Sequence, residues 1–176
     1  MARALPLRRY TRSTGNVANH RSAWKSLRLG CITTTEEYAN TLQATGNRLI
    51  GSAREMLTKV VPQRQQIDLV LVKLVLRDLG LKSGDNYHRI CALARKVGLQ
   101  LCPAEVGPAL RLAYPDQPVG NDLVVAMGPI ANSDNVPMIF SLRRPDAENW
   151  SLNSSLGSPG IFWNASFQFV FCVTVS

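Results

Sequence analysis

Residues 67–75 decide the fold, and they read Ile67-Asp68-Leu69-Val70-Leu71-Val72-Lys73-Leu74-Val75. This short run is rich in β-branched and aliphatic side chains, which favours a buried strand over a helix. The alternative is a helix that continues to Leu79. Asp68 and Lys73 interrupt the apolar run, which is the longest in the chain. A membrane-spanning helix needs about 18 apolar residues, so none is expected.

Upstream of this strand, the spacing predicts one helix over residues 36–60. The pairs Thr33–Glu36 and Thr34–Glu37 have capping-box spacing, in which a threonine oxygen accepts a backbone N–H and the glutamate returns to the cap. Apolar residues then recur at three- and four-residue steps, which is typical of one buried helix face. That face consists of Tyr38, Leu42, Leu49, Ala53, Met56, Leu57 and Val60.

Downstream of the strand, a second helix is expected over residues 85–97, because apolar residues recur at helical spacing and Gly98 stands where a left-handed C-cap belongs. From Leu99 onward, short apolar runs alternate with turn residues, which is typical of strands with short connections. Short connections imply antiparallel pairing. The candidate strands are Ala109–Tyr114, Leu123–Met127, Met138–Leu142, a weak strand near Trp150, and Phe167–Val175.

The expected fold class is therefore α+β, with two helices packed on a mainly antiparallel sheet in the order α-β-α-β-β-β-(β)-β. Residues 33–176 would form this single domain, which is long enough to bury a core without a disulfide or a metal. Residues 1–32 would form a basic, poorly ordered N-terminal arm, although Trp24, Leu27 and Leu29 could still dock on the domain.

The positive charge is concentrated in that arm. The formal net charge of the chain is +8, and residues 1–30 carry seven basic residues and no acidic one, so the remainder is close to neutral. Such an arm could neutralise phosphates and bind nucleic acid weakly, without sequence preference and with strong salt dependence. The candidate nucleic-acid contacts are Arg8, Arg9, Arg12, Arg21 and Lys25.

The cysteines predict neither disulfides nor a metal site. Cys31, Cys91, Cys102 and Cys172 form no CxxC pair, and no apolar signal-peptide core precedes them. Reduced thiols and a cytoplasmic location are therefore expected. His88 with Cys91 and Cys102 offers too few ligands for structural zinc. Because no glycine-rich phosphate loop is present either, the sequence predicts no cofactor.

Glu105 and Arg111 are the first candidates for ligand binding, because Pro103 and Pro108 stiffen the segment around them. On a strand, Arg111 would alternate with apolar neighbours and be exposed or line a cleft, where its guanidinium could bind a carboxylate or phosphate. The structural alternative is a salt bridge from Arg111 to Glu105 or Asp116 that pins the loop. Asp116 is the third candidate.

Aromatic residues are concentrated in the C-terminal third of the chain. Trp150 and Trp163 complete the ligand-binding candidates. Phe167, Phe169 and Phe171 alternate and would share one sheet face, so packing in the core is expected. If that face were exposed, it would form a dimer interface or an apolar ligand pocket.

One stretch carries a resemblance to known proteins. It reads Leu101-Cys102-Pro103-Ala104-Glu105-Val106-Gly107-Pro108-Ala109-Leu110-Arg111-Leu112-Ala113-Tyr114-Pro115-Asp116-Gln117-Pro118. Together with its continuation to Pro129, this stretch resembles a motif of uncharacterised bacterial hypothetical proteins. The resemblance covers about residue 34 to the C-terminus and omits the arm. It implies a domain start near Thr33 and a bacterial origin, and it implies no activity, cofactor or catalytic residue.

Three functions remain open. The favoured one is a non-enzymatic binding or protein-interaction module, because no catalytic set is assembled; its partner would be another protein, a second copy of the chain in a homodimer, or a small molecule. The first alternative is an enzyme of unrecognised type with a cleft around Glu105, Arg111 and Asp116. The second is weak nucleic-acid binding through the arm. No membrane partner is expected, since no amphipathic helix is apparent in the arm.

Overall fold

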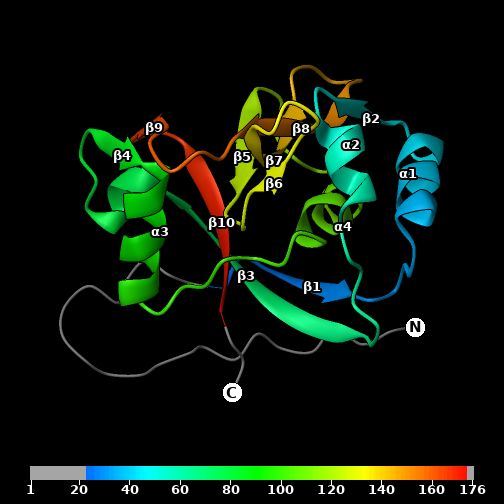
Figure 1. The fold of residues 1–176 in the computed structure, drawn as a ribbon, viewed down its shortest axis with the longest axis horizontal. Coiled ribbons are helices and arrows are strands. Elements are labelled where there is room, and N and C mark those ends of the chain that lie inside the picture. Colours follow the sequence, from blue (N-terminus) through cyan, green and yellow to red (C-terminus); the bar gives the residue numbers. More distant parts are fainter. Residues whose placement is uncertain (1–22, 174–176) are drawn as a thin grey trace.

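The computed structural model describes residues 23–173 (Figure 1). Within this range the chain is an α+β protein with four α-helices, a 3₁₀ helix over Leu76–Leu79, and ten strands. The helices are α1 Thr35–Ala44, α2 Ala53–Thr58, α3 Tyr87–Lys96 and α4 Val106–Ala113. The strands are β1 Lys25–Leu29, β2 Asn47–Ile50, β3 Ile67–Val75, β4 Gly84–Asn86, β5 Asn121–Val125, β6 Ile130–Ala131, β7 Pro137–Arg144, β8 Trp150–Leu156, β9 Phe162–Asn164 and β10 Gln168–Val173.

The main sheet is mixed, so the predicted pair of helices on a mainly antiparallel sheet is wrong. Its strand order is β1-β3-β10-β5-β7-β8-β2, with β6 paired to β7, while β4 and β9 form a separate two-stranded sheet. Two neighbouring pairs, β10–β5 and β2–β8, run parallel. Parallel pairing arises because β2 and β10 pair with strands far from them in the sequence, which short connections could not reveal.

The single helix predicted over residues 36–60 is also wrong. α1 begins as expected, since the Thr34 hydroxyl accepts the N–H of Glu37 at 3.1 Å. The helix then stops at Ala44, and the strand β2 lies between Gly46 and Gly51. These glycines have φ of +75° and +62°, left-handed values that an α-helix cannot contain. The apolar spacing that predicted one helix is therefore divided among α1, β2 and α2.

The strand predicted over Ala109–Tyr114 is the helix α4. Pro108 lies in the first turn of α4, where its missing N–H costs no helix hydrogen bond. Gly107 lets α4 approach β7 closely, because a Cβ on Gly107 would overlap the Phe140 ring. This close approach places the N-terminal end of α4 against the sheet.

Part of the segment assigned to the arm belongs to the sheet. Lys25–Leu29 forms β1, which pairs antiparallel with β3 along its whole length. Leu27 and Leu29 are buried, and they alternate with exposed Ser26 and Arg28. This alternation is a strand signal that the basic charge obscured, so the expected boundary at Thr33 falls too late. Arg8, Arg9, Arg12 and Arg21 lie outside the described residues.

Other predicted elements are confirmed. The strand 67–75 is β3, the helix 85–97 is α3, and β5, β7, β8 and β10 occupy four predicted strand positions with shifted ends. Residues 174 and 175, the end of the last predicted strand, lie outside the described residues. No helix within residues 23–173 is long and apolar enough to cross a membrane.

Helices cover the two faces of the sheet unequally. Figure 1 shows α1, α2 and α4 grouped at one side of the molecule, and α3 with β4 and β9 at the other. α4 packs on β1, β7 and β8, so it covers the face that carries Phe140. On α3, Tyr87 stacks on Phe169 of β10, whose side chain points to the opposite face from that of Gln168. The face under α4 is called the α4 face below.

Candidate binding site

Glu105 begins α4 and is completely buried, so it lines no cleft. Its carboxylate accepts hydrogen bonds from the Gly30 N–H at 2.9 Å, the Tyr38 hydroxyl at 2.7 Å and the Gln63 N–H at 2.7 Å. No positively charged side chain within residues 23–173 pairs with it. Glu105 therefore joins three distant segments to α4 and has a structural role.

Arg111 is also buried, with 1% of its surface exposed, so the prediction of an exposed or cleft-lining guanidinium is wrong. The reason is that residues 106–113 form a helix packed on β1, β7 and β8, so Arg111 does not alternate between two strand faces. Arg111 donates to the Gln117 side-chain oxygen and to the Tyr114 carbonyl, and its Nε has no partner. The salt bridge expected with Glu105 or Asp116 is absent from the described residues. Burial lowers the pKa of Arg111 to about 10.

The contacts of Arg111 help to fix the turn over residues 114–117. The Trp150 Nε1–H donates to the Pro115 carbonyl at 2.9 Å, and Arg144 donates to the Gln117 carbonyl at 2.6 Å. The Arg144 guanidinium lies 4.5 Å from the centre of the Trp150 ring. The turn is thus held by Arg111 on one side and by the Arg144–Trp150 pair on the other.

This turn presents Tyr114 to two lysines. The Tyr114 ring is buried and meets the Trp24 ring edge-on, with centres 5.0 Å apart. The Lys25 Nζ lies 5.6 Å from the Tyr114 ring centre. The Lys73 Nζ lies 4.6 Å from the Trp24 ring centre and 5.8 Å from that of Tyr114. Both ammonium groups are therefore within cation–π range of a shared aromatic base.

The two lysines carry charge that no carboxylate neutralises directly. Within the described residues, neither Lys25 nor Lys73 forms an ion pair. Burial lowers the pKa of Lys73, and the charge of nearby Asp116 opposes this shift. Asp116 itself is exposed. The site therefore contains two cations and one carboxylate.

Strand register extends this site across the α4 face. Residues that are directly opposite each other on neighbouring strands share a face, and diagonal neighbours lie about 7–8 Å apart. Lys73, Gln168 and Asn121 each lie two positions from the residue directly opposite the previous member of the site, and Arg144 lies directly opposite Asn121. The directly opposite pairs are Lys25–Leu71, Lys73–Val170, Gln168–Leu123 and Asn121–Arg144. Lys25, Lys73, Gln168, Asn121 and Arg144 form a line that we call the diagonal strip.

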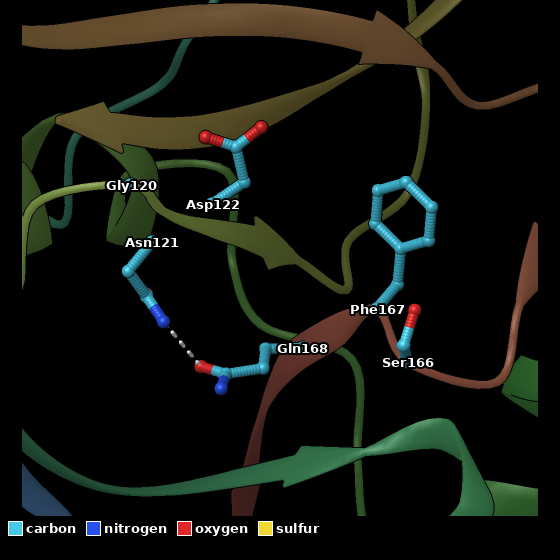
Figure 2. A pocket seen from close by; sticks show the side chains of 6 residues that line it. All are labelled: Gly120, Asn121, Asp122, Ser166, Phe167 and Gln168. Atoms are coloured by element: carbon cyan, nitrogen blue, oxygen red, sulfur yellow. Dashed lines mark hydrogen bonds between the residues drawn. The ribbon is translucent and has the colours of Figure 1, made fainter. Parts of the chain in front are cut away.

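A small hollow lies along the strip, where β5 and β10 begin. Its volume is about 220 Å³, and it is lined by Gly120, Asn121, Asp122, Ser166, Phe167 and Gln168. Figure 2 shows the Asn121 amide donating to the Gln168 side-chain oxygen, at 3.1 Å, while Asp122 and Phe167 point elsewhere. The Asn121 Oδ1 is buried and has no hydrogen-bond partner. The middle of the strip therefore has unused hydrogen-bonding capacity.

The structure separates the sequence candidates into two groups. Lys25 belongs to the strip, Asp116 lies near Lys73, and Trp150 supports Arg144 at the far end. Trp163 is not part of this site, because it packs against Phe167 and Phe169 on the side of the sheet occupied by α3.

Sequence reasoning missed Lys73, Tyr114, Gln168, Asn121 and Arg144. The available signal was Lys73, a charged residue inside a strand that is apolar apart from Lys73 and Asp68.

Among residues 23–173, the reactive side chains do not assemble into a catalytic set. Glu105 and Arg111 are buried at opposite ends of α4 and Asp116 is exposed, so these three residues line no common cleft. A hydrogen bond with Cys172, together with burial, raises the pKa of Cys102 well above its usual value. His88 is exposed on α3. Within residues 23–173, no group of three or more metal-ligating side chains is present.

Comparisons of the chain with protein-family models, curated proteins and solved structures found no match. The functional argument therefore rests on the diagonal strip itself.

Proposed function

We propose that this chain is a non-enzymatic binding module that binds an extended anionic ligand along the diagonal strip. The observation that carries the proposal is the placement of Lys25 and Lys73 as diagonal neighbours on one sheet face, both over aromatic rings and neither in an ion pair. Like charges placed this close repel each other, and burial adds a desolvation cost at Lys73. A bound anion would relieve both costs.

The fixed aromatic ring beneath the two lysines favours ligand binding over catalysis. The Tyr114 ring lies under both ammonium groups, and the turn that carries it is fixed by Arg111, Arg144 and Trp150. Groups held in advance lose little freedom when a ligand arrives, which improves affinity. A reaction would need a nucleophile with an adjacent base, and the described part of the strip contains no such pair.

The extent of the strip favours an elongated ligand. Cations stand at both ends, with Lys25 and Lys73 on β1 and β3 and Arg144 on β7. Residues 1–22 add five arginines and precede β1 directly in the sequence. A ligand with several negative charges could therefore contact positive charge at both ends of the strip.

The test is a binding titration of the full chain with inorganic polyphosphate. We expect the double variant Lys25→Ala/Lys73→Ala to bind at least about tenfold more weakly, since each charge-assisted contact contributes roughly 1.5–3 kcal/mol. The matched control is Lys82→Ala/Lys96→Ala, which removes the same charge from two exposed lysines outside the strip. Equal weakening in both double variants, or none in the first, would refute the strip as the binding site.

A further inference from the structure

We infer that the ligand of the diagonal strip is a single-stranded nucleic acid. This inference rests on the proposed function, because it names the class of anion that the strip would bind. Three features of the strip separate a nucleic-acid strand from a simple polyanion: its amide groups, its aromatic rings and its length.

The amide groups require a ligand that can donate hydrogen bonds. A phosphate chain offers acceptors only, which suits the ammonium groups of Lys25 and Lys73. The Asn121 side chain lines the hollow, and its Oδ1 lacks a partner. After a rotation of this amide, an N–H donor in the hollow would satisfy it. Nucleobases carry both N–H donors and acceptors on their edges, and asparagine and glutamine amides pair with such edges.

The aromatic rings suit unpaired bases. Trp24 lies beside the lysines and Trp150 beside Arg144, and both rings are partly exposed. Proteins that bind single strands combine a positively charged surface with aromatic side chains on which bases stack. A duplex keeps its bases stacked inside, so it could use the cations of the strip but not the rings.

The length of the strip suits a short strand. From Lys25 on β1 to Asn121 on β5, the line crosses three strand spacings and advances by six residues along the strand direction. With about 4.8 Å per strand spacing and about 3.3 Å per residue, this span is roughly 25 Å. Single-strand binding sites on small sheet domains begin at about four nucleotides.

The experiment compares three probes on the full chain by fluorescence anisotropy competition: a labelled 12-mer of thymidine, a hairpin duplex, and inorganic polyphosphate. We expect the thymidine strand to bind more tightly than either of the other probes. Trp24→Leu should weaken binding of the strand by roughly 5- to 150-fold, the range of one stacked base. It should weaken polyphosphate binding by a clearly smaller factor, because Lys73 loses one of its two aromatic neighbours but keeps its charge. Trp24→Phe should retain most of the strand affinity, and circular dichroism reports whether each variant is folded.

The outcomes separate the inference from the proposed function. If polyphosphate binds as tightly as the strand and Trp24→Leu affects both alike, the nucleic-acid inference fails while anion binding by the strip stands. If no probe binds, both fail. A variant without Arg8, Arg9, Arg12 and Arg21 should bind both flexible probes more weakly by a similar factor. If that variant lost all binding while Lys25→Ala/Lys73→Ala bound as tightly as the wild type, the assignment to the strip would be overturned.

Discussion

Glu105 and Arg111 are buried charges at the two ends of the same short helix, and their surroundings differ. The Glu105 carboxylate accepts from Gly30, Tyr38 and Gln63, which come from three segments far away in the sequence. Arg111 contacts Tyr114 and Gln117, only three and six residues away, and its Nε stays unpartnered. Glu105 therefore links distant segments of the fold, whereas Arg111 stabilises a single turn.

This contrast suggests that the two buried charges of α4 have different roles. A buried carboxylate with three donors leaves those donors unsatisfied when it is removed, and each unmade bond has a large cost. A buried guanidinium with a free Nε is incompletely satisfied, so its removal relieves some desolvation cost. We therefore expect Glu105 to contribute mainly to stability and Arg111 mainly to the shape of the binding site.

The largest effect is expected for Glu105→Ala. The free energy of unfolding should fall by about 3–5 kcal/mol, because the Gly30 and Gln63 N–H groups and the Tyr38 hydroxyl lose their acceptor. Urea denaturation followed by circular dichroism would measure this change. The control is Glu148→Ala, which removes an exposed carboxylate and should change stability by less than about 0.5 kcal/mol. A loss below about 1 kcal/mol for Glu105→Ala would contradict its connecting role.

Tyr38→Phe should show part of the same effect. This variant removes one hydroxyl donor to the Glu105 carboxylate and keeps the aromatic packing of a buried side chain. Hydrogen bonds to charged groups contribute roughly 1.5–3 kcal/mol, so the unfolding free energy should fall by about that amount. In a Glu105→Ala background the same change should have almost no effect, since the partner is absent. Additive losses in the double variant would show that the two residues act independently.

Arg111→Met should separate stability from binding. Methionine fills a similar volume without a charge, so the unfolding free energy should fall by only about 1–2 kcal/mol, from the Tyr114 carbonyl and the Gln117 amide oxygen left without donors. Polyphosphate affinity should nevertheless fall, because the turn that holds Tyr114 under the lysines loses one of its anchors. The measurement pairs urea denaturation with the binding titration. A destabilisation as large as that of Glu105→Ala would contradict the different roles assigned to Glu105 and Arg111.

Local signals predicted the parts of this fold that depend on local interactions. β3 and α3 followed from apolar spacing, and the cap at Thr34 followed from the capping-box pattern. The errors arose where two patterns compete. The apolar segment 106–113 fits both helix and strand spacing over so few residues, and the close packing of Gly107 on Phe140 is a tertiary contact that residue spacing does not reveal.

The sequence identified several residues of the candidate site, but it did not predict how they are arranged in space. Lys25, Asp116 and Trp150 were selected from the sequence for unrelated reasons, as an arm charge, a loop acid and an aromatic residue. Their proximity depends on the register of β1 with β3 and on the placement of β10 between β3 and β5. Such long-range pairing leaves no trace in residue spacing.

The smallest expected effect concerns pH and the Tyr38 hydroxyl, one of the three donors to Glu105. Burial raises the pKa of Tyr38 far above its usual value near 10, and the hydrogen bond to Glu105 and its charge raise it further. Well below pH 10 the phenol is protonated in both the folded and unfolded states, so it adds no pH dependence. As the pH approaches and passes 10, the unfolded chain releases this proton and the folded chain keeps it. The unfolded state then binds fewer protons, and stability falls as pH rises.

The wild-type chain should therefore lose about 0.8 kcal/mol more than Tyr38→Phe between pH 8 and pH 10.5, the amount expected for one phenol with an unfolded pKa of 10. Urea denaturation at the two pH values measures the difference, and lysines and other tyrosines cancel because both chains share them. Tyr87→Phe is the matched case, since burial also raises the pKa of Tyr87 while its hydroxyl contacts the backbone of Met127 and not Glu105. If the wild-type and Tyr38→Phe curves fall in parallel, the Tyr38 phenol ionises in the folded chain, and the tight contact between Tyr38 and Glu105 is incorrect.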